Sequence, residues 1–535
     1  MQRSPTMRAM ALALAAGLAL AALPGRGEPS APAARTNAVV NPFEGGPVAA
    51  PACAIDKAVF RNLERLGILP ASLCSDEVFV RRVYLDTTGA LPTVEEARAF
   101  LADERPDKRH ALIDRLLARD AFADYWSLKW CDLLRVKSEF PINLWPNAVQ
   151  AYHRWILASL RQNLPYDRFV RELLTTSGSN FHDPQVNFYR AVQNKEPPAL
   201  AQAVALTFMG VRADRWPEAR RNAMAAFFSQ VGYKATSEWK EEIVYFDISK
   251  ASNAVLQTTF PDGKPVRIAA GQDPREVFAD WLVDVRNPWF ARNIVNRVWF
   301  WLLGRGAAGD PDDLREDVPP ANPELLALLE KELVADRYDL RQLFRSILQS
   351  QTYQLSCLPR SRDPRAEAAF AYYPVRRLEA EVLIDAIDQI TGSAENYSSI
   401  IPEPYTFIPE DQNTVVLADA SISSPFLDLF GRSPRDSGLE AERNSRPTAA
   451  QCLHLLNSSN IQRKLEQGAR LRILLQAQKK PREIVDDLYL AILSRYPTEE
   501  ERKTVAAYRQ ANPTRRPGID LAWTLINSAE FQYRH

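Results

Sequence analysis

Two segments of the sequence concentrate side chains that could do chemistry. In the first, a predicted helix over residues 289–303, a sector of about 140° on a helical wheel holds two arginines and two amides. These are Arg292, Asn293, Asn296 and Arg297. Guanidinium groups form bidentate, charge-assisted hydrogen bonds with carboxylates and sulfates. The sector therefore predicts a site for an anionic group, with Arg297 binding the charge and Asn293 orienting the ligand. The alternative is that the arginines pair with the protein's own carboxylates.

The second segment, residues 431–457, combines acids, arginines and a histidine. Its charged and amide side chains are Arg432, Arg435, Asp436, Glu440, Glu442, Arg443, Gln451, His454 and Asn457. A carboxyl group beside an imidazole can perform general acid–base catalysis. We therefore predict Asp436 or Glu442 with His454 as catalytic residues, and Arg435 as a second ligand contact. A structural ion-pair network is the alternative. The two segments lie about 140 residues apart, so a shared cleft is a prediction about tertiary structure.

Metal and cofactor signatures are lacking in the sequence. It has only 5 Cys and 5 His, none in a Cys-x-x-Cys pattern, which is the usual spacing for zinc or haem attachment. Residues 310–317 are acidic, but Arg315 stands where a calcium loop needs glycine, so a turn is expected there. No G-x-S-x-G, P-loop or dinucleotide-binding glycine string is present. We therefore predict no metal site and no cofactor.

Apolar periodicity predicts a mainly α fold. Patterns of 3.6 residues and capping signals predict helices between residues 55 and 231, and again from residue 273 onwards. The predicted helices of the first region span residues 55–66, 93–101, 107–117, 148–160, 166–174, 199–209 and 218–231. Between the two regions, residues 243–246, 255–260 and 266–268 have β character. We predict two helical domains, residues 51–232 and 273–535, joined by a β-containing connector, residues 233–272.

The N-terminus predicts export. A basic start, an apolar run over residues 9–23 and a Pro/Gly break are typical of a signal peptide ending near residue 27. Residues 28–50, rich in Pro and Ala, predict a disordered lead. No later apolar run is long enough for a membrane span in the mature chain. A periplasmic or extracellular protein can hold disulfides, and a Cys53–Cys74 bond would contribute about 3 kcal/mol.

The charge balance limits the class of partner. The 535 residues carry 66 basic and 66 acidic side chains, which gives a formal net charge of zero. Nucleic-acid-binding proteins normally carry a basic excess. No nucleic-acid partner is therefore expected.

The order of several unusual strings identifies a family. The strings that carry the resemblance include residues 76–86, 106–117, 165–174, 287–299, 376–381 and 430–437. Together they closely resemble the paired domains of unknown function found beside planctomycete-type cytochrome c domains in large exported bacterial proteins. The resemblance covers roughly residues 55–530. This chain departs from the family in having no cytochrome domain and no Cys-x-x-Cys-His segment after Gly210, both of which count against a redox role.

Two functional classes follow. Members of this family are often found with sulfatases and other polysaccharide-degrading proteins, which implies a role in polysaccharide utilisation. With 11 Trp and 17 Tyr available to stack on sugars, we predict an exported protein that binds, or cleaves, an acidic or sulfated glycan. The alternative is a non-catalytic scaffold or partner of an exported redox complex, which the cytochrome association favours.

Overall fold

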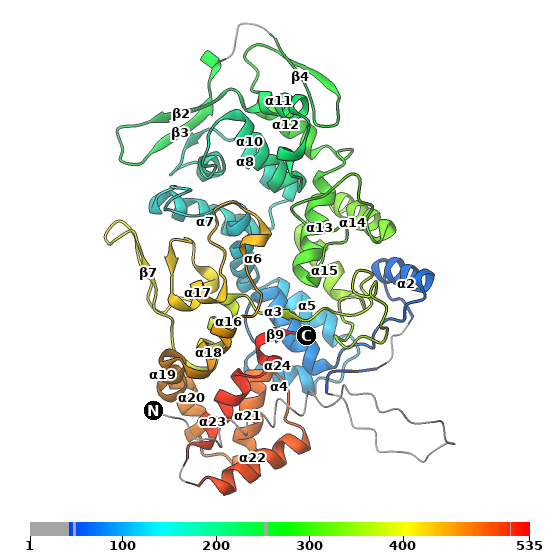
Figure 1. Ribbon diagram of the computed structural model, residues 1–535, viewed down its shortest axis with the longest axis vertical. Coiled ribbons are helices and arrows are strands. Elements are labelled where there is room, and N and C mark those ends of the chain that lie inside the picture. Colours follow the sequence, from blue (N-terminus) through cyan, green and yellow to red (C-terminus); the bar gives the residue numbers. More distant parts are fainter. Residues whose placement is uncertain (1–41, 47–49, 251–254, 514) are drawn as a thin grey trace.

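The computed structural model describes residues 42–46, 50–250, 255–513 and 515–535, and its fold is mainly α, as predicted (Figure 1). The predicted signal peptide, residues 1–27, and most of the predicted lead, residues 28–50, lie outside the described residues. The molecule is elongated, with β2, β3 and β4 towards one end and α19–α23 at the other (Figure 1).

The first half of the chain is a series of short helices. They are α2 (Ala54–Leu66), α3 (Asp76–Thr88), α4 (Val94–Ala102), α5 (Lys108–Leu117), α6 (Asp120–Leu133), α7 (Pro146–Arg161), α8 (Tyr166–Thr175), α9 (Asn187–Arg190), α10 (Pro197–Val204) and α11 (Glu218–Ala225). The predicted capping box is present at the start of α4, where Thr93 and Glu96 each accept the other's backbone N–H. This local signal therefore sets where α4 begins, whereas α5 to α10 begin without a side-chain cap.

Two predicted helices are shorter than the apolar pattern indicated. The helix expected over residues 199–209 ends at Val204 and continues as a π-helical turn, Ala205–Met209. The helix expected over residues 218–231 ends at Ala225, and strand β2 (Val231–Ala235) begins at its predicted last residue. Val231 pairs with Phe246 in a sheet, so tertiary pairing overrides the helical period here.

The β-containing region consists of two small antiparallel units. Strand β3 (Glu242–Phe246) lies between β1 (Gly178–Ser179) and β2. Strands β4 (Leu256–Thr259) and β5 (Pro265–Ile268) form a hairpin, whose turn contains Gly263 at φ +86°. These strands confirm the β character predicted for residues 243–246, 255–260 and 266–268. Strand β1 comes from the first helical half and was not predicted.

The second half is again helical. Its helices are α12 (Pro274–Val283), α13 (Phe290–Leu303), α14 (Pro323–Ala335), α15 (Leu340–Gln349), α16 (Ala380–Thr391), α17 (Pro425–Phe430), α18 (Ala449–Asn457), α19 (Ser459–Gln467), α20 (Ala469–Gln476), α21 (Pro481–Leu493), α22 (Glu499–Ala511), α23 (Pro517–Ile526) and α24 (Ala529–Gln532). Four two-residue strands form two further pairs, β6 (Arg376–Arg377) with β9 (Tyr533–Arg534) and β7 (Ser398–Ser399) with β8 (Ile422–Ser423).

Helices from the two halves pack against one another. Helix α5 contacts α15, α2 contacts α14, and α4 contacts α21. One continuous cluster of buried apolar side chains runs through both halves, and the C-terminal end of the chain lies near the centre of the molecule (Figure 1). Residues far apart in sequence therefore meet in the interior. The predicted domain boundaries stay a prediction.

The predicted disulfide does not form in the structure. Cys53 and Cys74 are both free thiols. Cys53 precedes α2 and its thiol donates to Asp56 Oδ2 at 3.2 Å. Cys74 is buried, and its backbone pairs with Glu44 and Gln354. Each cysteine is thus held by its own local contacts, and the backbone pairing of Cys74 was not foreseen. Among the described helices, none has the length and apolar character needed to cross a membrane.

Candidate functional site

The arginine-and-amide sector on α13 is mostly buried. Arg297 is 1% exposed, and its Nη2 donates to Pro311 O and to Asp312 Oδ1, both at 2.9 Å. Asn293 Nδ2 donates to Thr207 O at 3.0 Å. Gly210, at φ +66°, lets the backbone approach this amide, because a Cβ there would lie 2.5 Å from Asn293 Oδ1. Asn293 therefore ties the π-helical turn to α13, and Arg297 pairs with Asp312, which is the alternative considered for the arginines of this sector.

Arg435 is also enclosed. It is 0% exposed, and its Nε donates to Asp132 Oδ1 at 2.8 Å. Arg443 shares the same carboxylate through Asp132 Oδ2 at 2.6 Å and reaches Glu381 at 2.5 Å. Burial alone would raise the pKa of Asp132, but Arg443 and Arg435 outweigh it and lower that pKa. The 431–457 segment thus contains the ion-pair network that was its alternative interpretation.

The three predicted catalytic residues are not assembled into a unit. Asp436 accepts from Lys137 Nζ at 2.8 Å, and Glu442 accepts the backbone N–H groups of Ser437 at 2.6 Å and Asp436 at 3.2 Å. His454 packs edge-on against two phenyl rings, and burial lowers its pKa. Within the described part of the chain, no hydrogen bond or ion pair joins His454 to either acid. The geometry offers no general acid–base pair here.

The two segments that were predicted to share a cleft nevertheless contact each other. The contact is made by Glu440, which was not among the predicted site residues. The backbone N–H of Glu440 donates to Asp312 Oδ2 at 2.7 Å, and Glu440 Oε2 accepts from Trp301 Nε1 at 3.0 Å. Arg297 Nη1 lies 3.9 Å from the same carboxylate. Glu440 therefore joins α13 to the 431–457 segment, and it also lines a cavity.

We call this cavity, of about 730 Å³, the arginine cleft. It lies between the C-terminal end of α13, residues 375–379, residues 440–447 and strand β9. The lining residues that carry charge are Lys129, Arg376, Arg377, Arg443, Arg446 and Arg534, against Glu379 and Glu440. Three aromatic side chains, Phe300, Trp301 and Tyr533, share the wall. None of Asn293, Arg297, Arg435, Asp436, Glu442 and His454 is among its lining residues.

The acid at the base of the arginine cleft is clamped between two cations. Glu379 Oε1 accepts from Lys129 Nζ at 2.9 Å, and Glu379 Oε2 lies 2.7 Å from Arg534 Nη2. Burial by itself would raise the pKa of Glu379, but Arg534 and Lys129 hold it well below its usual value. Arg534 also pairs with Asp86 at 3.2 Å. Glu379 is therefore ionised at neutral pH and fixes both cations in place.

Other cations of the arginine cleft lack a carboxylate partner. Arg377 is 7% exposed, donates to Gln451 Oε1 and lies 4.9 Å over the Phe430 ring. Arg446 is exposed. Within the described residues neither arginine forms an ion pair. Burial lowers the pKa of Arg377, which reflects the cost of keeping this cation without a counter-ion. The cleft therefore carries a positive surplus that an anionic ligand would neutralise.

One segment that carries the family resemblance also lines the arginine cleft, although the predicted site residues did not come from it. Residues 376–381 are part of the pattern that carries the family resemblance, and they supply Arg376, Arg377 and Glu379. Arg376 bonds the last carbonyls of α13, at Trp301 O and Leu302 O. Arg534, the penultimate residue of the sequence, arrives through the β6–β9 pairing. That pairing could not be read from local sequence.

A separate group of aromatic side chains reaches the surface elsewhere. Trp145, Trp239 and Tyr405 come from three distant loops and contact one another, with ring centroids 4.8 to 6.0 Å apart. Trp239 is 55% and Tyr405 52% exposed. Lys240 Nζ lies 4.9 Å over the Trp145 ring. This aromatic cluster is a second surface on which sugar rings could stack, with one cation rather than several.

Two family models match the chain. Residues 54–233 match PSCyt2, a protein of unknown function (DUF1549), and residues 274–509 match PSD1, a protein of unknown function (DUF1553). No curated protein and no solved structure matches it. No cytochrome domain is detected beside the two matched domains. The chain therefore belongs to the proteins that pair these two domains of unknown function, the family that its sequence resembles.

Proposed function

We propose that this protein binds an acidic or sulfated glycan in the arginine cleft. The observation that carries the proposal is the composition of the cavity wall. It holds six basic side chains against two acidic ones, with three aromatic rings among them. Arginine recognises carboxylate and sulfate groups through paired N–H donors. Aromatic side chains with one polar edge bind the apolar faces of sugar rings while their polar groups stay hydrogen-bonded.

The cations divide into two roles. Lys129, Arg443 and Arg534 are held by carboxylates, so they shape the floor and supply a fixed field. Arg377 and Arg446 have no carboxylate partner among the described residues and are the groups left to bind an acidic substituent. A cavity of about 730 Å³ is within the usual range for a small-ligand site, which here corresponds to one or two sugar units of a longer chain.

Binding is better supported than cleavage. A glycosidase needs one carboxyl group that is protonated at working pH to act as general acid. Glu379 is held ionised by Arg534 and Lys129, which disqualifies it as a proton donor. Glu440, the other acid of the wall, accepts from Trp301 Nε1 at 3.0 Å and lies 3.9 Å from Arg297 Nη1, so it too is engaged by donors of the protein. Asp436, Glu442 and His454 do not line the cavity. We therefore propose a binding protein, exported as its N-terminal pattern predicts.

The alternative function, a scaffold or partner in an exported complex, is supported by a different surface. That surface lies on α19–α23, and the inference from it is developed below. The family is associated with cytochrome domains. The described residues of this chain show no contact surface that would identify a redox partner.

Titration of a sulfated oligosaccharide and its desulfated counterpart tests the proposal. The wild-type protein should bind the sulfated form at least tenfold more tightly, because the desulfated form leaves the surplus cations unneutralised. Arg446→Ala should weaken that binding about 5- to 20-fold, in keeping with about 1 to 2 kcal/mol for a partly exposed charged hydrogen bond. Since Arg446 is exposed and forms no ion pair within the described residues, the fold should be unaffected.

Trp239→Ala is the matched control, because it removes an exposed side chain outside the arginine cleft. Binding should be unchanged in this variant. Loss of binding in Trp239→Ala with full retention in Arg446→Ala would place the sugar at the aromatic cluster and refute the proposal for the cleft.

A further inference from the structure

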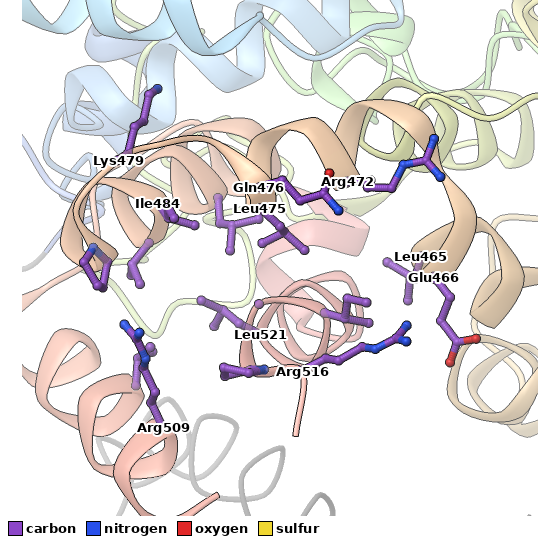
Figure 2. A pocket seen from close by; sticks show the side chains of 17 residues that line it. Leu465, Glu466, Arg472, Leu475, Gln476, Lys479, Ile484, Arg509, Arg516 and Leu521 are labelled. Atoms are coloured by element: carbon purple, nitrogen blue, oxygen red, sulfur yellow. The ribbon is translucent and has the colours of Figure 1, made fainter. Parts of the chain in front are cut away.

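A second cavity lies at the far end of the molecule from the β units. It is formed by α19 to α23, has a volume of about 660 Å³, and is shown in Figure 2. We call it the C-terminal groove. Figure 2 shows Leu475 and Gln476 on one side and Leu521 and Arg516 on the other. The groove contains none of the residues discussed so far, so it is independent of the arginine cleft.

The floor of the C-terminal groove is aliphatic. Its apolar lining residues are Leu465, Leu475, Ile484, Val485, Leu488, Val505, Ile519 and Leu521, together with two prolines. No aromatic side chain is among its lining residues. A floor without rings is poorly suited to stacking sugars, whereas branched aliphatic side chains pack well against other aliphatic side chains.

The rim of the groove is basic and largely unpaired. Arg472, Arg509 and Arg516 are exposed and form no ion pair within the described residues. Lys479 is paired with Asp487 at 2.6 Å, and Glu466 is the only acidic lining residue. In Figure 2, Arg472 and Arg516 lie towards one end of the groove, and Lys479 and Arg509 towards the other. Positive charge therefore flanks the apolar floor along its length.

The groove continues over α22. A neighbouring cavity of about 640 Å³ shares Pro481, Val485, Val505 and Arg509 with it. This extension adds Lys503, which also lacks an ion pair among the described residues, and Arg502, which pairs with Asp486 and Glu499. The combined surface is an open, elongated trough and not a closed pocket. An acyl chain would be better enclosed by a tunnel with charge at one mouth only.

We propose that the C-terminal groove docks an acidic amphipathic helix of a protein partner. A helix is about 10 to 12 Å wide with its side chains and presents one apolar stripe flanked by polar faces. Its stripe would pack on the aliphatic floor, as in other helix-in-groove complexes, while Glu or Asp on both flanks would meet the unpaired arginines. The charge pattern selects an acidic partner and disfavours a basic or neutral one.

A panel of designed helical peptides provides the probe. Three peptides would carry Leu or Ile at i, i+3, i+4 and i+7 with Glu elsewhere, each with a scrambled control of the same composition. Fluorescence anisotropy with the full chain should give binding at least tenfold tighter for a patterned peptide than for its scrambled control. Binding should weaken as salt rises, because the rim charges are exposed.

Charge reversal locates the contact. Arg509→Glu combined with Arg516→Glu should weaken peptide binding at least tenfold, and Leu475→Ser should weaken it severalfold by removing part of the floor. Arg463→Glu is the matched control, since Arg463 is exposed on α19 and outside the groove. It should leave binding unchanged. Thermal unfolding of each variant shows whether the fold is retained.

Three results would overturn the docking proposal. One is equal binding of patterned and scrambled peptides, or no binding of any patterned peptide. Another is wild-type affinity in the folded double reversal variant. The third is concentration-dependent self-association that Arg509→Glu and Arg516→Glu abolish, which would assign the groove to a second copy of this chain. None of these results bears on glycan binding in the arginine cleft.

Discussion

The arginine cleft and the C-terminal groove are both basic, but their cations are held in different ways. In the cleft, Lys129 and Arg534 are buried and bonded to Glu379. In the groove, Arg509 and Arg516 are exposed and have no carboxylate partner within the described residues. A buried ion pair fixes the position of its charges before any ligand arrives, whereas exposed arginines adapt and are screened by salt. The fixed charges of the cleft therefore favour a small anion of defined geometry. The adaptable charges of the groove favour a broad, deformable partner.

The same contrast predicts which substitutions change the stability of the fold and which change ligand binding. Removing one partner of a buried pair leaves a charge without compensation, which costs far more than losing an exposed cation. Substitutions in the cleft network should therefore act first on folding, and substitutions on the groove rim should act on association alone. The predictions below follow from this difference, from the largest effect to the smallest.

Glu379→Gln should destabilise the protein by about 3 to 5 kcal/mol, the range for breaking a buried ion pair. The neutral amide would leave the charge of Lys129 uncompensated, because Lys129 has no other carboxylate within ion-pair distance among the described residues. It would also weaken the contact that holds Arg534. Chemical denaturation of the variant checks this loss. A change below 1 kcal/mol would mean that the cleft charges are not coupled as the distances indicate.

Two buried acids should give opposite pH responses. The pKa of Asp385 is raised to about 7 by burial, only partly offset by hydrogen bonds from Val415 N and Thr414 N, whereas Lys129 and Arg534 hold that of Glu379 low. The raised pKa means that Asp385 contributes stability below about pH 4 that is lost as pH rises through 7, an effect of about 4 kcal/mol. Glu379 contributes stability above about pH 4 that is lost only on strong acidification.

Denaturation curves between pH 3 and pH 8 separate these two contributions. Asp385→Asn should flatten the decline of the free energy of unfolding between pH 4 and pH 7. Glu379→Gln should flatten the loss on acidification instead. The acids Asp388 and Glu395 and the cation Lys464 lie in the same cluster as Asp385. Both variants keep these three residues, so the wild-type profile is the baseline. Identical profiles for the two variants would contradict the assignment.

Arg377→Lys should weaken binding of the sulfated oligosaccharide about 3- to 10-fold. Lysine keeps the charge but loses the planar pair of N–H donors and the contact with the Phe430 ring. The measurement is a titration of the folded variant with the sulfated oligosaccharide. Unchanged affinity would show that Arg377 contributes only long-range charge, and the bidentate role proposed for it would be wrong.

Arg516→Ala should change the free energy of unfolding by less than about 0.5 kcal/mol, as is usual for an exposed side chain without special contacts. The measurement is the same denaturation experiment used for Glu379→Gln. A loss above 1 kcal/mol would show that the groove rim is structural, and the contrast with the cleft would disappear.

The sequence predicted the elements better than the site. The capped helix α4 and the amphipathic helix α7 lie close to their predicted positions. Arg297 and Arg435 were predicted to contact a ligand, but neither the helical spacing around Arg297 nor the loop sequence around Arg435 tells an inward arginine from an outward one. Asp132, which pairs with Arg435, lies 303 residues away. Likewise, Arg376 lies opposite Arg534, and Arg377 opposite Tyr533, in the β6–β9 pair, a long-range contact that no local pattern encodes.

A crossed titration tests most directly whether the arginine cleft and the C-terminal groove are separate sites of different chemistry. Arg446→Glu and Arg516→Glu would each be titrated with the sulfated oligosaccharide and with the patterned acidic peptide. We predict that Arg446→Glu weakens only the oligosaccharide, by at least tenfold, and that Arg516→Glu weakens only the peptide. If either folded variant lowers both affinities equally, or if Arg446→Glu leaves the oligosaccharide bound as in the wild type, the account is contradicted.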